Sequence, residues 1–101
     1  MFNYLDDTYS NASFEKTPND SIDFDTLQKA RQDLIGEIQA IIEYDAHIHS
    51  STNAVAKETW RSIKNEELVH VGELLGLIGY LGPDQRQYVV KGLDEFNKMH
   101  K

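Results

Sequence analysis

Apolar residues recur along residues 26–50 at alternating steps of three and four, and this spacing predicts a helix with one packed face. The positions on this face are Leu27, Ala30, Leu34, Glu37, Ile41, Tyr44 and Ile48. The polar run SSTN follows at its end, and Asn53 is a typical N-cap for a second helix. A connection this short predicts that the two helices are antiparallel neighbours.

The second helix is predicted over residues 54–81, where Gly82-Pro83 stops it. The same steps continue through Trp60, Ile63, Glu67, His70, Leu74, Leu77 and Leu81. Other apolar residues make this helix hydrophobic on most of its circumference, so a two-helix hairpin cannot bury it alone. Its glycines, Gly72, Gly76 and Gly79, each cost about 1 kcal/mol relative to alanine, which close packing of another backbone would explain. Both features predict a second subunit.

A third, shorter helix is predicted over residues 84–98, with Asp84 as its N-cap and Gln87 three residues later. Its single apolar edge consists of Val89, Leu93 and Phe96, so it is a supporting helix. The predicted fold is therefore all-α: an antiparallel two-helix hairpin plus a short C-terminal helix. Two copies would dimerise into a four-helix bundle.

Residues 1–25 differ from the rest, since they hold six acidic residues against one lysine and show no sustained period. This composition predicts a flexible acidic tail in front of one helical domain over residues 26–101. The tail also contains isolated aromatic residues, and a strap that docks on a partner subunit is the alternative interpretation. These aromatic residues are Phe2, Tyr4, Tyr9 and Phe14.

Composition narrows the function classes. A chain of 101 residues is one small domain, near the size where association adds useful stability. It has no cysteine, which excludes disulfides, iron–sulfur clusters and thiol chemistry. The net charge of −7, without a Lys/Arg run, argues against nucleic-acid or anionic-membrane binding. The apolar stretch 68–81 is shorter than the roughly 20 residues of a membrane span, and no secretory signal is visible. We expect a cytoplasmic protein.

Three ionisable residues interrupt the two apolar faces at similar depth: Glu37 on the first helix, and Glu67 with His70 on the second. A buried, unpaired carboxylate costs several kcal/mol or takes up a proton. The faces contain no lysine or arginine, and one imidazole cannot balance two carboxylates. A multivalent cation would balance them.

The spacing agrees with a metal site. Glu67 and His70 stand at i and i+3, so both can reach one ion from the same side of a helix. Di-iron and di-manganese carboxylate bundles use a Glu from each of two helices and a Glu-x-x-His from each of the other two. This chain offers half of that set, and a two-fold dimer would supply ligands for two ions. Such ligation suits Fe(II) or Mn(II) better than copper or a Cys-based zinc site.

The stretch GEIQAIIEYDAHIHSSTN…NEELVHVGELL resembles the encapsulated-ferritin branch of the ferritin-like superfamily, over roughly residues 27–97. The resemblance implies that Glu37, Glu67 and His70 are ferroxidase ligands and that Tyr44 lies near the metal. It also implies oxidation of Fe(II) by dioxygen at a di-iron site between two subunits of a ferritin-like four-helix bundle, in iron storage or detoxification. Dimers would assemble into a higher ring, a decamer, as cargo of an encapsulin shell.

The chain departs from the family in two places. Family members often carry a tryptophan and further acidic residues beside the first-helix glutamate, whereas this chain has Gly36, Gln39 and Glu43 there, which argues against an accessory metal site. Members also carry a C-terminal tag that docks them in the encapsulin nanocompartment, and no such tag is recognised in FNKMHK. We expect the tag on a longer form of the chain, or a fusion, or a protein that acts outside a shell.

Several alternatives remain open from the sequence. Tyr44 is either a neighbour of the metal ligands or a core aromatic with its hydroxyl in water. Glu66 and Glu73 lie near His70, and we interpret them as surface or inter-subunit charges rather than accessory ligands. The site would also suit peroxide or manganese chemistry in another di-metal oxidoreductase. A metal-free helical interaction module, with a buried ion network that sets dimer register, is the alternative from another class.

Overall fold

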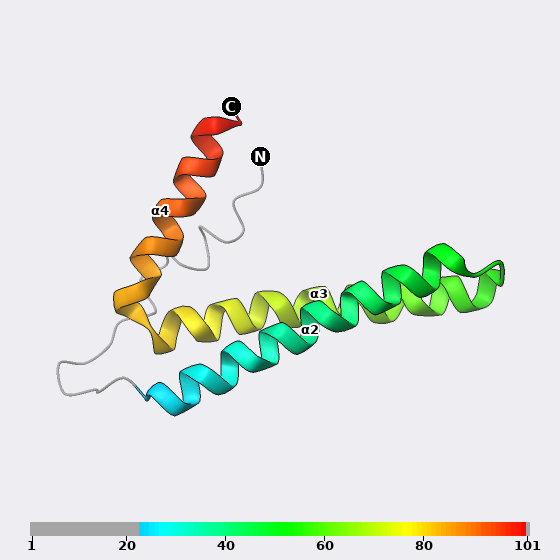
Figure 1. The fold of residues 1–101 in the computed structure, drawn as a ribbon, viewed down its shortest axis with the longest axis horizontal. Coiled ribbons are helices and arrows are strands. Elements are labelled where there is room, and N and C mark those ends of the chain that lie inside the picture. The colour runs from blue at the N-terminus through cyan, green and yellow to red at the C-terminus, as the bar shows by residue number, and fades with distance from the viewer. Residues whose placement is uncertain (1–22, 101) are drawn as a thin grey trace.

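The computed structural model describes residues 23–100, so nearly all of the predicted acidic tail lies outside the described residues. Within this range the chain forms three helices: α2 (Phe24–Ser50), α3 (Ala54–Leu81) and α4 (Pro83–Met99). Helices α2 and α3 run side by side as an antiparallel hairpin, and α4 leaves the end of α3 at a steep angle (Figure 1). The prediction of an all-α hairpin with a short C-terminal helix is confirmed for these residues, and dimerisation stays a prediction.

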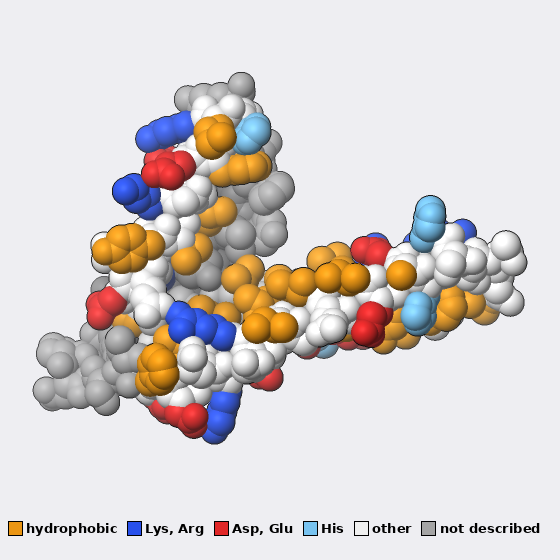
Figure 2. Space-filling model, viewed as in Figure 1, with side chains coloured by type: hydrophobic (Ala, Val, Ile, Leu, Met, Phe, Trp, Pro, Cys, Tyr) orange, Lys and Arg blue, Asp and Glu red, His pale blue; other side chains and the backbone are white. Residues whose placement is uncertain are grey.

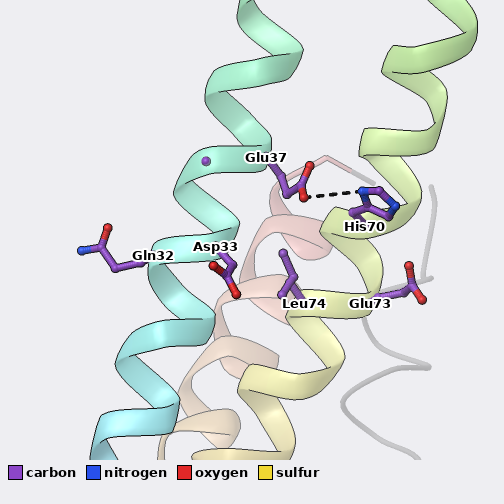
Figure 3. Close-up of a pocket in the computed structure, with 7 residues that line it drawn as sticks. Gln32, Asp33, Glu37, His70, Glu73 and Leu74 are labelled. Carbon is purple, nitrogen blue, oxygen red and sulfur yellow. Dashed lines mark ion pairs between the residues drawn. The ribbon is translucent and has the colours of Figure 1, made fainter.

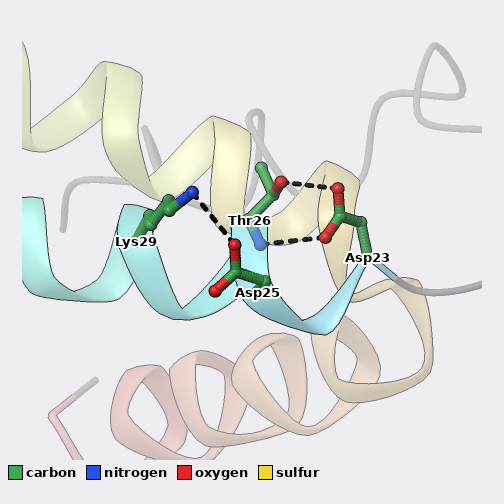
Figure 4. A network of polar contacts seen from close by, with 4 residues as sticks. All are labelled: Asp23, Asp25, Thr26 and Lys29. Atoms are coloured by element: carbon green, nitrogen blue, oxygen red, sulfur yellow. Dashed lines mark hydrogen bonds and ion pairs between the residues drawn. The ribbon is translucent and has the colours of Figure 1, made fainter.

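Helix α2 begins at Phe24, two residues before the predicted start, because Asp23 caps it. The Asp23 carboxylate accepts hydrogen bonds from the backbone N–H of Thr26, at 3.0 Å, and from the Thr26 hydroxyl (Figure 4). Both bonds favour the charged form, so Thr26 lowers the pKa of Asp23. An i, i+4 ion pair between Asp25 and Lys29, at 2.9 Å, links the first two turns of the helix.

Helix α3 has the predicted bounds, and its predicted cap is confirmed. The Asn53 side-chain oxygen accepts from the backbone N–H of Ala56 at 3.0 Å. The Ser51 hydroxyl in turn accepts from the backbone N–H of Asn53 at 3.1 Å, which fixes the cap inside the short connection. The turn geometry thus follows from the SSTN run.

The predicted cap of the third helix is wrong. Helix α4 begins at Pro83, its N-cap is Gly82, no side chain makes a capping bond, and Asp84 lies in the first turn. Proline takes the first helical position because its fixed φ suits the helix and it has no N–H to satisfy there. The Gln87 amide donates to the backbone carbonyl of Asp84 at 3.1 Å, which is not the contact of a capping box.

The hydrophobic core of the described residues is small and lies where α2, α3 and α4 meet. Only Leu27 and Ala30 are buried among the apolar side chains described; Gly79 and Gly82 are buried as well, and a Cβ on Gly82 would meet Leu27 at 3.5 Å. We call these four residues the corner. The Cα radius of gyration is 16.6 Å, against about 13 Å for a compact domain of this length. The chain is therefore an open hairpin rather than a closed bundle.

Large apolar side chains remain exposed along the whole hairpin, and hydrophobic atoms form rows on its surface and on α4 (Figure 2). On α2 and α3 the exposed set is Phe24, Ile35, Ile38, Ile42, Val55, Leu68, Val69, Leu77 and Tyr80. Two helices can cover only one side of each other, so these faces lie open in a single chain. No helix among residues 23–100 combines the length and apolar character needed to cross a membrane.

Candidate metal centre

Helices α2 and α3 bring the three predicted ligands together in the middle of the hairpin. One ligand atom from each of Glu37, Glu67 and His70 lies within 4.8 Å of the other two. The Nδ1 atom of His70 is 3.5 Å from the nearer Glu37 oxygen and 3.6 Å from the nearer Glu67 oxygen. Glu37 and His70 point toward one another from opposite helices (Figure 3). We call these residues the Glu–Glu–His group.

Register explains why they meet. Glu37 lies on the face that α2 presents to α3, since it follows Ala30 and Leu34 by seven and three residues. Glu67 and His70 are one turn apart on α3, and the antiparallel pairing sets them opposite Glu37. An ion pair from Lys64 to Asp45, at 2.8 Å, joins the same two helices farther along and holds this register.

The carboxylates of the group are partly withdrawn from water, with side-chain exposures of 24% for Glu37 and 20% for Glu67. Within the described residues both pair with His70, whereas the lysines that form ion pairs are engaged elsewhere. Those other pairs are Lys29 with Asp25, Lys64 with Asp45, and Lys98 with Asp94. Two half-buried carboxylates against one imidazole leave an excess of negative charge, which favours a cation.

The spacing from His70 to each carboxylate fits a shared transition-metal ion. Nitrogen and carboxylate donors lie about 2.0–2.2 Å from such an ion, so two donors on one ion are at most about 4.4 Å apart. The His70–Glu37 and His70–Glu67 separations of 3.5 and 3.6 Å meet that limit. Two oxygens and one nitrogen are donors that suit Fe(II) or Mn(II). Three donors leave coordination positions open.

The group borders an open hollow of about 620 Å³ between the two helices. Its lining includes Glu37 and His70, together with Gln32, Asp33, Gly36, Glu73 and Leu74 (Figure 3). A Cβ atom built on Gly36 would meet nothing within 4 Å, and the same holds for Gly72. The backbone beside the group is therefore uncovered in a single chain.

Two acidic residues of this lining were not assigned to the site from the sequence. Asp33 was not singled out, although it precedes Glu37 by four residues and so lies on the same side of α2. Glu73 is exposed, as expected for a surface charge, but it also borders the hollow three residues after His70. The i, i+3 and i, i+4 spacing from each predicted ligand was the signal that would have found them. Glu66, by contrast, is exposed and outside the lining.

Tyr44 lies two helical turns beyond Glu37, about 10 Å along α2, and is half-buried. Its ring meets His47 edge-on at a centroid distance of 6.5 Å, and His47 meets Trp60 at 5.1 Å. Among the described residues, Tyr44 belongs neither to the Glu–Glu–His group nor to the lining of the hollow. Its predicted place beside the metal stays a prediction.

Comparison of the chain with protein-family models, with curated proteins and with solved structures finds no match in any of the three. The class of the protein is therefore defined by its own fold and site. It is an all-helical protein with an open hairpin and a carboxylate–histidine group suited to a metal ion.

Proposed function

We propose that this protein is a ferroxidase that oxidises Fe(II) to Fe(III) with dioxygen. The observation that carries the proposal is the convergence of Glu37, Glu67 and His70 from two helices onto one point, where both carboxylates are half-buried and His70 is exposed. Their residue types match the Glu plus Glu-x-x-His half-set of di-iron carboxylate bundles. The resemblance to encapsulated ferritins over residues 27–97 supports the same activity.

The proposed site is completed by a second copy of the chain. One group holds three donors, which suffice for one ion. The hollow beside the group stays open, and among the described residues no further carboxylates complete a two-ion site. A two-fold axis beside the hollow would bring a second group opposite the first and give four carboxylates and two imidazoles. It would also cover apolar side chains such as Leu77, which is 41% exposed. Site completion and burial thus require the same dimer.

The roles of the residues follow from their chemistry. The carboxylates of Glu37 and Glu67 bind the substrate ions and favour the higher charge that appears as Fe(II) becomes Fe(III). His70 contributes a neutral nitrogen donor. Each Fe(II) gives up one electron, and dioxygen accepts the electrons. Asp33 and Glu73 surround the approach with negative charge, which raises the local concentration of cations.

The wider assembly follows from the resemblance alone. We include in the proposal a decameric ring of dimers, a cytoplasmic location and an encapsulin shell that receives the oxidised iron. A related oxidoreductase that uses manganese or reduces peroxide at the same two-ion site would use the same ligands.

A metal-free interaction module is the second candidate, and the uncovered apolar faces of α2 and α3 favour it. In that case His70 would serve only as the partner of the two carboxylates, and the group would set the register of a dimer. Divalent metal would then change neither the assembly nor its thermal stability.

The test is anaerobic titration of the metal-free protein with Fe(II), followed by an air pulse and optical detection of Fe(III). We expect saturation near one iron per chain and oxidation that is lost in Glu67→Gln. Glu66→Gln is the matched control, because it removes the same charge from an exposed neighbour outside the group. A lack of stoichiometric binding, or equal oxidation in both variants, would contradict the proposed ferroxidase activity and favour the interaction module.

A further inference from the structure

A second concave surface lies where α4 leaves the hairpin, away from the Glu–Glu–His group. It has a volume of about 260 Å³, and its apolar lining includes Leu34, Leu75, Ile78 and Val89. Arg31 and Arg86 line the same groove. The Arg31 guanidinium donates to the side chains of Gln28 and Gln85, which places it between α2 and α4. We call this surface the corner groove.

The chemistry of the corner groove selects its ligand. An apolar floor takes a hydrophobic side chain, and a guanidinium forms charge-assisted, bidentate hydrogen bonds with a carboxylate. The fitting ligand is therefore a short segment that carries an aromatic residue next to an acidic one. The pair Phe14-Glu15 has this composition, in a segment that holds four acidic residues and one lysine over positions 1–22.

We propose that residues 13–15 of the same chain dock in the corner groove, with Phe14 on the apolar floor and Glu15 paired with Arg31. This inference does not depend on the ferroxidase proposal, because it uses a different surface and no metal.

The length of the connecting chain permits this docking. Phe14 lies nine positions before Asp23, and an extended chain of nine steps spans up to about 30 Å. Leu34 follows Asp23 by eleven residues, which corresponds to about 16 Å along α2. A segment folded back along α2 therefore reaches the groove without strain. Tethering also gives it a local concentration near the millimolar range, which favours it over a second copy.

The docked segment would have a structural consequence. Helix α4 contacts the hairpin only near the corner and then projects away from it (Figure 1). The groove has walls from α2, α3 and α4, so a side chain seated there would touch all three helices. Docking of residues 13–15 thus fixes the angle at which α4 leaves α3.

Disulfide trapping in the full-length chain tests the proposal, and the absence of native cysteines makes every added thiol unique. The probe pair is Ser13→Cys with Val89→Cys; Val89 borders the groove and is 41% exposed, so a smaller side chain is tolerated there. The control pair is Ser13→Cys with Tyr88→Cys. Tyr88 is the neighbour of Val89 on α4, is 68% exposed and does not line the groove, so an undocked segment would reach the two positions equally.

We expect the probe pair to form a disulfide within one chain at least tenfold faster than the control pair, as measured by mass spectrometry in dilute solution. Adding Phe14→Ala should return the rate to that of the control, and Glu15→Lys should slow it severalfold. Equal rates for the two pairs, or a disulfide that joins two chains, would overturn the proposal. If the Val89 variant unfolds by circular dichroism, a nitroxide on Ser13→Cys alone replaces it. The nitroxide must then broaden the amide signals of Leu34 and Val89, and their full retention would overturn the proposal.

Discussion

The corner and the Glu–Glu–His group lie on the same hairpin and follow the same spacing of residues, yet they differ sharply in burial. Leu27 and Ala30, at the corner, are 1% and 2% exposed. Two to three turns along the same face of α2, the Glu37 side chain is 24% exposed, and no residue in the middle of the hairpin is fully buried among those described. The corner has three helices around it, whereas the middle has two.

This difference shows what a helical stripe means. The stripe identifies the face of a helix that packs, but neighbouring elements decide how much of that face is covered. At the corner the chain supplies all the neighbours. In the middle the chain supplies two helices and the Glu–Glu–His group, and the remaining neighbours belong to the proposed second copy. The corner is complete in one chain, whereas the proposed site in the middle requires a metal ion and a second copy.

The largest effect is expected at the corner. Leu27→Ala removes a fully buried side chain and leaves a cavity, so it should lower the free energy of unfolding by about 3 kcal/mol. Urea unfolding followed by circular dichroism measures this change. Val55→Ala is the control, since Val55 is 75% exposed, and its effect should stay within about 0.5 kcal/mol. Equal effects at both positions would show that the corner is not the core of the chain.

The middle should respond to metal where the corner does not. At a concentration of Fe(II) or Mn(II) about 100 times the dissociation constant, one bound ion stabilises the native state by about 2.7 kcal/mol. Anaerobic thermal unfolding with and without metal measures the gain. We expect Glu67→Gln to abolish it and Glu66→Gln to retain it, because only Glu67 belongs to the group. A melting temperature that ignores metal in the parent chain would contradict the proposed site.

The proposed dimer predicts a smaller effect at a glycine. Gly36 borders the hollow, and a Cβ there meets nothing within 4 Å, so Gly36→Leu fits a single chain and raises helix propensity by under about 1 kcal/mol. If a second copy covers the hollow, the leucine obstructs it and weakens association at least tenfold, or about 1.4 kcal/mol.

Gly92→Leu is the matched control for this variant, since Gly92 lies in α4 and also has open space around it. Sedimentation equilibrium gives the dissociation constants. Equal association of the two variants would place the interface away from the hollow.

Much of the fold was predictable from local chemistry. The SSTN run fixed both the end of α2 and the start of α3, because Asn53 caps α3 with its own side chain. The start of α4 differs from the expected one, since Asp84 resembles a cap in sequence but Pro83 takes the first helical position. Both residues favour a helix start, and only the geometry of the chain decides between them.

The candidate site was predictable in its charged centre and less so around it. Glu37, Glu67 and His70 stood out because they interrupt apolar faces, and the structure brings them together. Asp33 and Glu73 are exposed and lie outside the two apolar stripes, so the same reasoning does not select them. Whether an exposed carboxylate borders a hollow depends on the spacing of two helices, which periodicity in one helix does not contain.

The smallest effect is expected at the start of α2, on the complete side of the comparison, and it depends on pH. Hydrogen bonds from Thr26 hold the folded-state pKa of Asp23 below its ordinary value of 3.8. A group with a depressed pKa contributes stability that is present above the unfolded value and is lost as the pH falls through the folded one. Asp23→Asn keeps a capping oxygen but does not titrate, so it isolates this term from the other carboxylates. The stability of the parent relative to Asp23→Asn should therefore fall as the pH drops below 3.8, by a small amount because the side chain is exposed to solvent. Urea unfolding of both proteins across this range measures the difference, and a constant difference would mean that the Thr26 contacts stabilise the charged and neutral carboxyl equally.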